Sequence, residues 1–590
     1  MTAIRIQYMR AENIQYGLVV VGSIRYENGV IENLKTRIPK PPSLPIMGKA
    51  LPIETTFNLP LPLPSWQPGS GFGSRSIDLG GLEVCRVSTF KRVWAAYEGG
   101  PGNLGATFFE PMAIPQGFFM LGGYCQPNNR PLNGWVLVAK DGAALAKPTD
   151  YNLVWSSESL KMKQDSHGHF WLPVPPDGYI AVGLVVTASP EKPSVDSIRC
   201  VLSDFTEPSQ AETSIWVSPN NATESLKVSS SRPQSRGTRA LGVSVGTYIA
   251  EVNSSVNPLR CLKNNSSSYT SYMPSRSQID ALIRTYSPLF YFHPKEKYLP
   301  SSVRWFFSNG ALLYKKGNES NPVPIEPTGS NLPQDGSNDG LYWLDLPVTK
   351  VGKGKVKKGD LQSSEGYLHV KPMYGGTFTD IAIWLFYPFN GPSRAKLWVV
   401  NVPLGRIGEH VGDWEHVTLR VNNFDGGLYK VFFSQHSGGT WVDASELEYQ
   451  ACGGGESNRF VAYSSLNGHA TYSKPGLVLQ GSRKIGIRND TAKSCLTVDM
   501  AASFSLVAID YAAAGGSVAP PPWLNYMRKW GPKITYNIAE KVEKVGNVLP
   551  RKLKSAFHGL VKSLPSELFG EEGPTGPKVK TNWSGDEASC

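Results

Sequence analysis

Residues 405–421, GRIGEHVGDWEHVTLRV, bring two histidines and two acids together within positions 410–416. The apolar alternation that follows predicts a strand, whose successive side chains point to opposite faces. Asp413 and Glu415 then share one face with Val417, and the residues between them face the other way. Two neighbouring carboxylates raise each other's pKa, and a divalent cation relieves their repulsion. The pattern therefore predicts a metal-centred site at the N-terminal end of a strand.

Three histidines at expected strand ends are candidate partners of these carboxylates: His410, His436 and His469. Each stands beside glycine or serine, where loops converge. Oxygen ligands with peripheral histidine favour Mg²⁺ or Ca²⁺ over Mn²⁺ or Zn²⁺. A structural role stays open, because a single histidine is more often a satisfied loop or core residue. The carboxylates can likewise cap loops or pair with Arg406 or Arg420.

Composition favours a mainly β protein of two or three domains, since 46 prolines, 59 glycines and short alternating runs are spread over 590 residues. The seven cysteines form no CxxC pair, which is typical of a reducing compartment. The net charge of +11 comes without a zinc-finger, RRM or KH signature, so no nucleic-acid partner is expected. We expect a cytoplasmic chain, peripheral on endomembranes, without signal peptide or transmembrane segment.

Shifts in composition predict the domain organisation. The expected parts are a disordered extension (1–56), a β-rich module with two internal repeats (57–245), a linker (246–275), an antiparallel β-sandwich with the metal site (276–520) and a basic amphipathic helical tail (521–590). Few peripheral helices are expected, one of them after a Ser275 cap. The lysine-rich stretch 350–360 resembles a glycine-spaced loop. Both basic stretches are either solvated surface or attracted to an anionic membrane.

The N-terminal module contains an internal echo. FEPMAIPQGFFMLG (109–122) and FWLPVPPDGYIAVG (170–183) align without a gap, and each is followed by an apolar strand that ends in a charge. A Pro-x-Gly turn followed by an aromatic residue reverses the chain and fills the core. We therefore expect a repeated β-unit.

The segment EHVGDWEHVTLRV resembles the heptapeptide region of the necrosis- and ethylene-inducing-peptide-like toxins. That resemblance implies a β-sandwich that holds a divalent cation for sphingolipid head-group recognition, with His410, Asp413 and Glu415 at the matching positions. IAIWLFYPFN is similar to the preceding toxin strand, whose final acidic ligand is replaced here by Asn390. His469, in NGHA, is similar to a later histidine of the toxin site.

Longer stretches carry a second resemblance, among them FNLPLPLPSWQPGSGF, YEGGPGNLGATFFEP, YFHPKEKYLPSSVRWFFSNGALLYKK and GEEGPTGPKVKTNWSGDE. From residue 57 onward the chain resembles a plant family of unknown function related to vacuolar protein sorting-associated protein 62. The family name implies vacuolar trafficking and no settled activity. The repeated β-unit is similar to the adaptor-binding repeats of large vacuolar-sorting lipid-transfer proteins, which implies a proline-containing protein partner.

Three functions fit these observations. The first is a binding protein with a metal-dependent site for an anionic or sugar-bearing lipid head group. The second is a metal-dependent hydrolase that uses the His410, Asp413 and Glu415 cluster, with His410, Glu415, His436 and His469 as candidate catalytic residues. The third is a structural protein in which the polar cluster organises the edge of a sandwich and holds no metal.

Overall fold

Strands dominate the chain, which confirms the predicted mainly β class. The computed structural model describes residues 53, 55–66, 71–219, 224–334, 336–436, 438–452, 455–482, 484–512, 516–533, 537–547, 549–563 and 573–588. Apart from residues 53, 55 and 56, the extension predicted for 1–56 lies outside the described residues.

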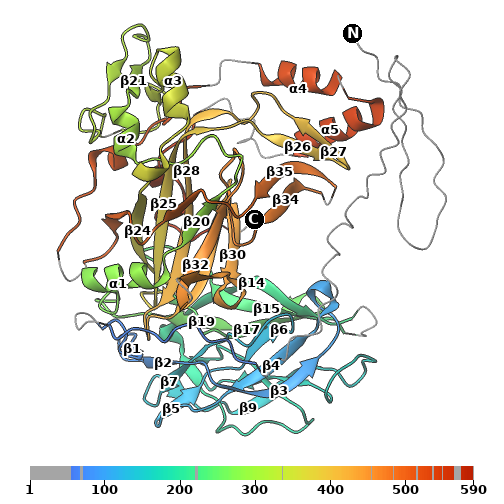
Figure 1. Ribbon diagram of the computed structural model, residues 1–590. Coiled ribbons are helices and arrows are strands. Elements are labelled where there is room, and N and C mark those ends of the chain that lie inside the picture. The colour runs from blue at the N-terminus through green and yellow to red at the C-terminus, as the bar shows by residue number, and fades with distance from the viewer. Residues whose placement is uncertain are drawn as a thin grey trace. The chain divides into compact units, whose positions relative to one another are not determined.

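The N-terminal module is built of small antiparallel sheets (Figure 1). Their orders are β1-β2-β7-β5, β3-β4-β6, β12-β10-β9, β11-β13-β8 and β16-β19-β14-β15-β17-β18. The strands are β1 (Ser76–Asp78), β2 (Glu83–Val87), β3 (Phe90–Ala96), β4 (Ala106–Pro111), β5 (Phe118–Met120), β6 (Tyr124–Pro127), β7 (Val136–Lys140), β8 (Leu145–Ala146), β9 (Asp150–Ser156), β10 (His169–Val174), β11 (Tyr179–Ile180), β12 (Val185–Thr187), β13 (Cys200–Leu202), β14 (Thr206–Val217), β15 (Leu226–Pro233), β16 (Gly242–Val243), β17 (Tyr248–Val252), β18 (Ser255–Val256) and β19 (Arg260–Lys263).

The two echoed segments adopt the same local structure. Gly117 (φ 80°) and Gly178 (φ 82°) turn the chain into β5 and β11, and both strands pair with the apolar strand that follows the echo, β7 or β13. Gly122 and Gly183 meet, since a Cβ on Gly122 would lie 2.8 Å from the Gly183 Cα. Only glycine permits this approach.

The segment predicted as a linker, 246–275, contains strands instead. β17 pairs with β15, and β19 pairs with β14, in the six-stranded sheet of the N-terminal module. Tyr248, Ala250 and Leu262 are buried there. Each strand is too short to show a clear period, and the surrounding serines and asparagines dominate the composition.

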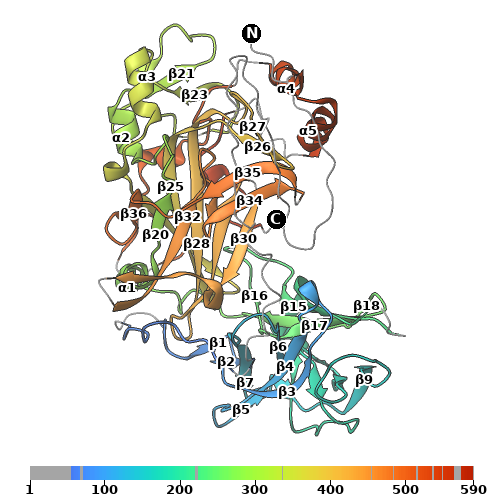
Figure 2. The same ribbon diagram turned by 45° about the vertical axis from the view of Figure 1, so that its right-hand side comes forward.

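A sandwich follows helix α1 (Arg276–Tyr286), which begins with the predicted Ser275 cap as a full capping box. One sheet has the order β30-β29-β28-β25-β24-β37 and the other β31-β32-β20-β36 (Figure 2). Its strands are β20 (Leu289–Phe292), β24 (Gly366–Met373), β25 (Phe378–Asn390), β28 (His410–Asn422), β29 (Leu428–Gln435), β30 (Gly438–Asp443), β31 (Tyr449–Cys452), β32 (Gly455–Ser464), β33 (Thr471–Tyr472), β36 (Thr497–Asp499) and β37 (Phe504–Ile509). β24 pairs with β37, and β20 with β32, in parallel, and the other pairs are antiparallel.

The two faces of the six-stranded sheet bury different cores. Val417 and Leu419 pack with α1 and the second sheet. Trp384 and Trp414 pack on the opposite face with α2 (Val303–Ser308) and tryptophans of the last seventy residues. A small sheet of β21 (Leu312–Lys315), β22 (Val323–Pro324) and β23 (Tyr342–Asp345) adds to this second face. Alternation along β28 therefore directs Val417 and Leu419 to one face of the sheet and Trp414 to the other, as predicted.

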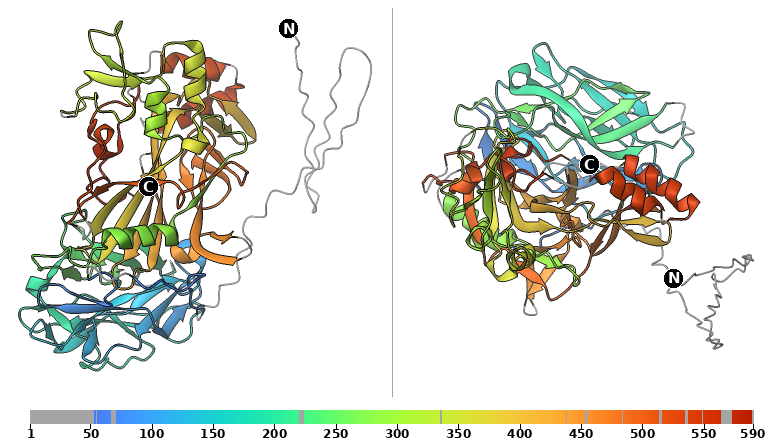
Figure 3. Two further views of the ribbon diagram at one scale, coloured as in Figure 1. Left: turned by 60° about the vertical axis from the view of Figure 1, so that its left-hand side comes forward. Right: turned by 90° about the horizontal axis from the view of Figure 1, so that it is seen from above.

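Two basic stretches differ from their sequence-based interpretation. The loop expected at 350–360 contains helix α3 (Lys350–Lys357), because Thr349 caps it and Val356 is buried. The tail does contain helices α4 (Ile538–Asn547) and α5 (Arg551–Ser563), which pack against each other (Figure 3). Residues 573–588 are not an amphipathic helix, since Gly573, Pro574 and Gly576 interrupt one, and they run over the second face of the sheet.

A third sheet, β27-β26-β35-β34, receives the tail helices. It consists of β26 (Arg394–Leu397), β27 (Val400–Pro403), β34 (Gly476–Gly481) and β35 (Ile485–Thr491). Val542, Phe557 and Leu560 of the helices are buried against it. Within the described part of the chain, no helix is both long enough and apolar enough to cross a bilayer.

The two modules share a core and belong to one compact unit that begins at Pro52. Phe378 of β25 is 1% exposed and packs against Trp135 of the N-terminal module, with ring centroids 5.3 Å apart. A buried side chain that contacts both modules couples the unfolding of one to the unfolding of the other.

Phe378→Ala is therefore expected to destabilise the whole unit by about 3–5 kcal/mol, because it leaves a cavity between the modules. Urea unfolding followed by tryptophan fluorescence and by circular dichroism measures this, with the half-exposed Val323→Ala as control. The expected result is one shared transition that moves only in Phe378→Ala. Separate transitions, of which Phe378→Ala shifts one, would contradict the shared core.

Candidate functional site

A cavity of about 590 Å³ opens where β28 begins. Its walls come from the ends of β25 and β28, from β29, and from residues 573–588, called the C-terminal segment below. Most of the predicted site residues line it: Asn390, His410, Asp413, Glu415 and His436. His469 lies behind this lining and is fully buried. The structure thus brings the predicted residues together around one pocket.

Asp413 is held in a fixed orientation. Its Oδ2 accepts a hydrogen bond from His469 Nδ1 at 2.9 Å, and its Oδ1 accepts one from the Trp414 amide at 3.0 Å. Burial opposes ionisation, but the bond from His469 and the nearby His410 and Lys580 outweigh it and lower the pKa of Asp413. The carboxylate is therefore charged at neutral pH.

His410 presents a lone pair to the pocket. Its Nδ1–H donates to the Gly412 carbonyl at 2.6 Å, which leaves the Nε2 lone pair available. Burial lowers the pKa of His410, although Asp413 opposes the shift. The neutral imidazole thus acts as an acceptor. Gly412, whose carbonyl accepts the bond from His410, has φ 69°, and a Cβ there would lie 2.7 Å from the Trp530 carbonyl oxygen.

Glu415 is buried at 6% exposure and accepts a hydrogen bond from the Ser434 hydroxyl. The same hydroxyl oxygen accepts the backbone N–H of His416 at 2.9 Å. Ser434 belongs to β29, so the neighbouring strand sets the position of this carboxylate. Each carboxylate of the predicted cluster therefore has one side-chain partner outside the motif, His469 for Asp413 and Ser434 for Glu415.

The C-terminal segment supplies pocket residues that sequence reasoning missed. Glu587 accepts hydrogen bonds from His416 Nε2 at 3.1 Å and from the Thr418 hydroxyl at 2.6 Å. Lys580 Nζ donates to the Trp414 carbonyl at 3.3 Å. The available signal was the sequence GPTGP followed by NWSGDE, whose glycines, prolines and paired acids do not suit an amphipathic helix.

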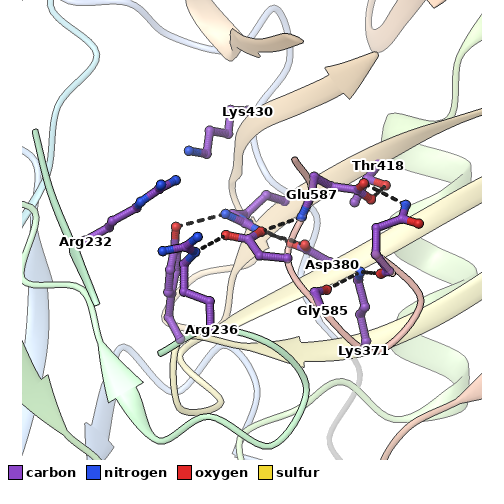
Figure 4. A network of polar contacts seen from close by, with 12 residues as sticks. Arg232, Arg236, Lys371, Asp380, Thr418, Lys430, Gly585 and Glu587 are labelled. Carbon is purple, nitrogen blue, oxygen red and sulfur yellow. Dashed lines mark hydrogen bonds and ion pairs between the residues drawn. The ribbon is translucent and has the colours of Figure 1, made fainter. Parts of the chain in front are cut away.

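A buried ionic network holds this segment on the sheet (Figure 4). Arg420 donates to both carboxylate oxygens of Asp380 at 2.7 Å and to Asp586 at 2.6 Å, and its side chain is fully buried. Arg236 of the N-terminal module pairs with Asp586 at 3.0 Å. Lys371 Nζ donates to two backbone carbonyls of the segment at 2.6 and 2.9 Å. The network therefore joins both modules to the C-terminal segment.

The fit of the pocket to a metal ion can be judged from its donors. Among the described residues, no three histidine, cysteine or acidic side chains are placed to hold an ion. The residues form no preassembled ion site, so the divalent cation stays a prediction and no step is assigned to it.

Comparison with protein families and with known proteins gives three findings. The family model described as vacuolar protein sorting-associated protein 62 matches residues 53–587. Comparison with curated proteins gives no match. Several solved structures are similar to parts of the chain, and they include necrosis- and ethylene-inducing proteins.

Three of these structures illustrate the level of similarity. GNIP1Aa from Chromobacterium piscinae is 18% identical over 34% of this chain and 40% of its own, with a TM-score of 0.25. NLPPya in complex with glucosamine is 13% identical over 36% and 70%, with a TM-score of 0.18. Necrosis and Ethylene inducing Protein 2, from the causal agent of cocoa's Witches Broom disease, is 13% identical over 33% and 67%, with a TM-score of 0.17. These scores are too low to assign a ligand or residue role here.

Arg420→Met is expected to lower the free energy of unfolding by about 3–5 kcal/mol, because it leaves the Asp380 carboxylate buried without its partner and leaves Asp586 with Arg236 alone. Arg406→Met is the control, since Arg406 is 61% exposed and its pair with Glu409 is worth at most about 1 kcal/mol. Urea unfolding measures both. Equal midpoints for the two variants would show that the buried network does not stabilise the fold.

Glu587 gives a pH-dependent prediction. Burial opposes its ionisation, but His416, Lys371 and the hydrogen bonds to His416 and Thr418 outweigh burial and lower its pKa. The carboxylate then stabilises the fold fully above its unfolded pKa of about 4.3, and this contribution falls as pH drops toward the folded pKa.

The difference in unfolding free energy between wild type and Glu587→Gln is therefore expected to be largest at neutral pH and to shrink below about pH 4.3. Thermal unfolding across this range measures it, with the exposed Glu110→Gln as control. A difference that stays constant down to about pH 3 would rule out a charged Glu587 as the source.

Proposed function

The chain belongs to the vacuolar protein sorting-associated protein 62 family, and we propose that it is a binding protein whose pocket holds a sugar-bearing head group. The observation that carries the proposal is a set of hydrogen-bond acceptors held in fixed positions at the N-terminal end of β28. Asp413, Glu415 and His410 line one cavity of about 590 Å³, and the hydrogen bond from His410 Nδ1 to Gly412 leaves the Nε2 of that ring as the acceptor. That volume suits a small ligand, since ligand pockets span about 300–1,000 Å³.

The charge of the pocket favours a ligand that donates hydrogen bonds. Among the described residues, the lining carries four carboxylates, Glu409, Asp413, Glu415 and Glu587, and one ammonium group, that of Lys580. Ionised carboxylates only accept hydrogen bonds, whereas hydroxyl and ammonium groups donate them. Neutral and amine-bearing sugars therefore fit the lining better than an anionic group does.

An anionic head group would require a cation to offset these carboxylates. Mg²⁺ or Ca²⁺ remains the sequence-based prediction for that cation, and the proposal assigns binding to the protein's own groups. The hydrolase alternative and the proline-containing partner of the N-terminal repeats likewise stay predictions.

Calorimetric titration of the chelator-treated chain with glucosamine, glucose and glucose 6-phosphate tests the proposal. The expected order of affinity is glucosamine, then glucose, then glucose 6-phosphate, because the pocket offers charged acceptors. Asp413→Asn and Glu415→Gln are each expected to weaken glucosamine binding at least about tenfold, the loss of one charge-assisted hydrogen bond.

Glu110→Gln is the matched control, because Glu110 is exposed on β4 and lies outside the pocket lining. Unchanged glucosamine affinity in Glu415→Gln, or a preference for glucose 6-phosphate without metal, would contradict the proposal. A repeat with added Mg²⁺ or Ca²⁺ tests the cation separately, since a metal site is expected to reverse the order of preference.

A further inference from the structure

The turn between β26 and β27 exposes a contiguous apolar surface. Trp398 is 41%, Val399 89% and Val400 37% exposed, and these three residues are called the hairpin tip below. Single exposed apolar side chains are ordinary, whereas a tryptophan and two valines in sequence at a turn form a patch. The patch lies at the turn of the hairpin formed by β26 and β27, the two strands labelled in Figure 2.

The rest of the hairpin is anchored, so the tip has a defined position. Leu397 is fully buried and Val402 is 5% exposed, both in the core that receives α5. The Trp398 amide donates to the Lys484 carbonyl at 2.7 Å, which ties the tip to the turn between β34 and β35. The exposure of the tip is therefore a feature of an ordered hairpin.

The backbone at the tip favours glycine, yet it carries tryptophan. Leu397 pairs with Val400, so Trp398 and Val399 form a two-residue turn. Trp398 has φ 54°, in the left-handed region that bulky residues rarely occupy and that such turns usually give to glycine or asparagine. Among the described residues, the exposed Trp398 ring forms no aromatic pair that would explain its strained backbone, which points to a role outside the fold.

Basic side chains lie on the hairpin and on the elements packed against it. The hairpin residues 394–403 include Arg394 and Lys396 and no acid, and Lys484 is exposed on the adjoining turn. Helix α5, which packs against β26 and β35, is also free of acids and exposes Arg551, Lys552 and Lys562. The combination of a protruding Trp-Val-Val tip with lysine and arginine is complementary to an anionic surface that has an apolar interior.

We propose that the hairpin tip docks on an anionic lipid bilayer, with Trp398 and Val399 entering the interface and the surrounding bases contacting the head groups. Tryptophan prefers the bilayer interface, and stable peripheral binding needs both an apolar and an electrostatic contribution. The tail helices do not provide the apolar part, because Val542, Phe557 and Leu560 are buried against the protein. The contact uses residues outside the pocket and is independent of the sugar-binding function.

Vesicle flotation of the full chain tests this contact. The vesicles are phosphatidylcholine alone or with about 30% phosphatidylserine, neither containing a sugar lipid. The variants are Trp398→Gly and Val399→Asp, and the control is Val351→Asp, since Val351 is 84% exposed on α3. Wild type and Val351→Asp are expected to bind the anionic vesicles, and each tip variant to bind at least about tenfold more weakly.

Trp398→Gly separates docking from folding, because glycine adopts positive φ without strain. Its melting temperature is expected to equal or exceed that of wild type while vesicle binding is lost. The proposal is overturned if wild type does not bind anionic vesicles, if it binds neutral vesicles equally well, or if both tip variants bind like wild type.

Discussion

The Arg420 guanidinium lies fully buried against the carboxylates of Asp380 and Asp586. Arginine does not lose its proton in a protein, so a buried guanidinium must remain paired. Asp380 comes from the neighbouring strand and Asp586 from the C-terminal segment, and Arg236 of the N-terminal module holds Asp586 from its other side. This constraint fixes the segment on the sheet, and the segment then supplies a pocket wall that includes Glu587.

Local patterns predicted the strand and the facing of its side chains, since alternation along β28 is a property of the chain itself. The Ser275 cap is predictable for the same reason. Docking of residues 573–588 depends on partners more than 160 residues away in the sequence, such as Arg420. Such partners cannot be identified from the local spacing of apolar residues. The strands in 246–275 were not predicted, because β17 and β19 are only five and four residues long and lie among serines and asparagines. Helix α3 was not predicted either, because the burial of Val356 outweighs the low helix propensity of its glycines.

Residues 391–409, between β25 and β28, connect the pocket to the hairpin tip. Ser393 and Gly408, near the start and the end of this segment, line the pocket, and Trp398 lies at the turn of the hairpin between them. At most about 17 Å of extended chain separates Ser393 from Trp398. A tip docked on a bilayer would therefore hold the acidic pocket near the head-group layer.

A crystal structure of the chain grown with glucosamine tests the central claim most directly. The claim predicts electron density for the sugar in the pocket, with hydroxyl or ammonium groups within hydrogen-bond distance of Asp413 and Glu415 and with the C-terminal segment in place. Density for the sugar at another surface, or a pocket filled by protein side chains while glucosamine binds in solution, would contradict it.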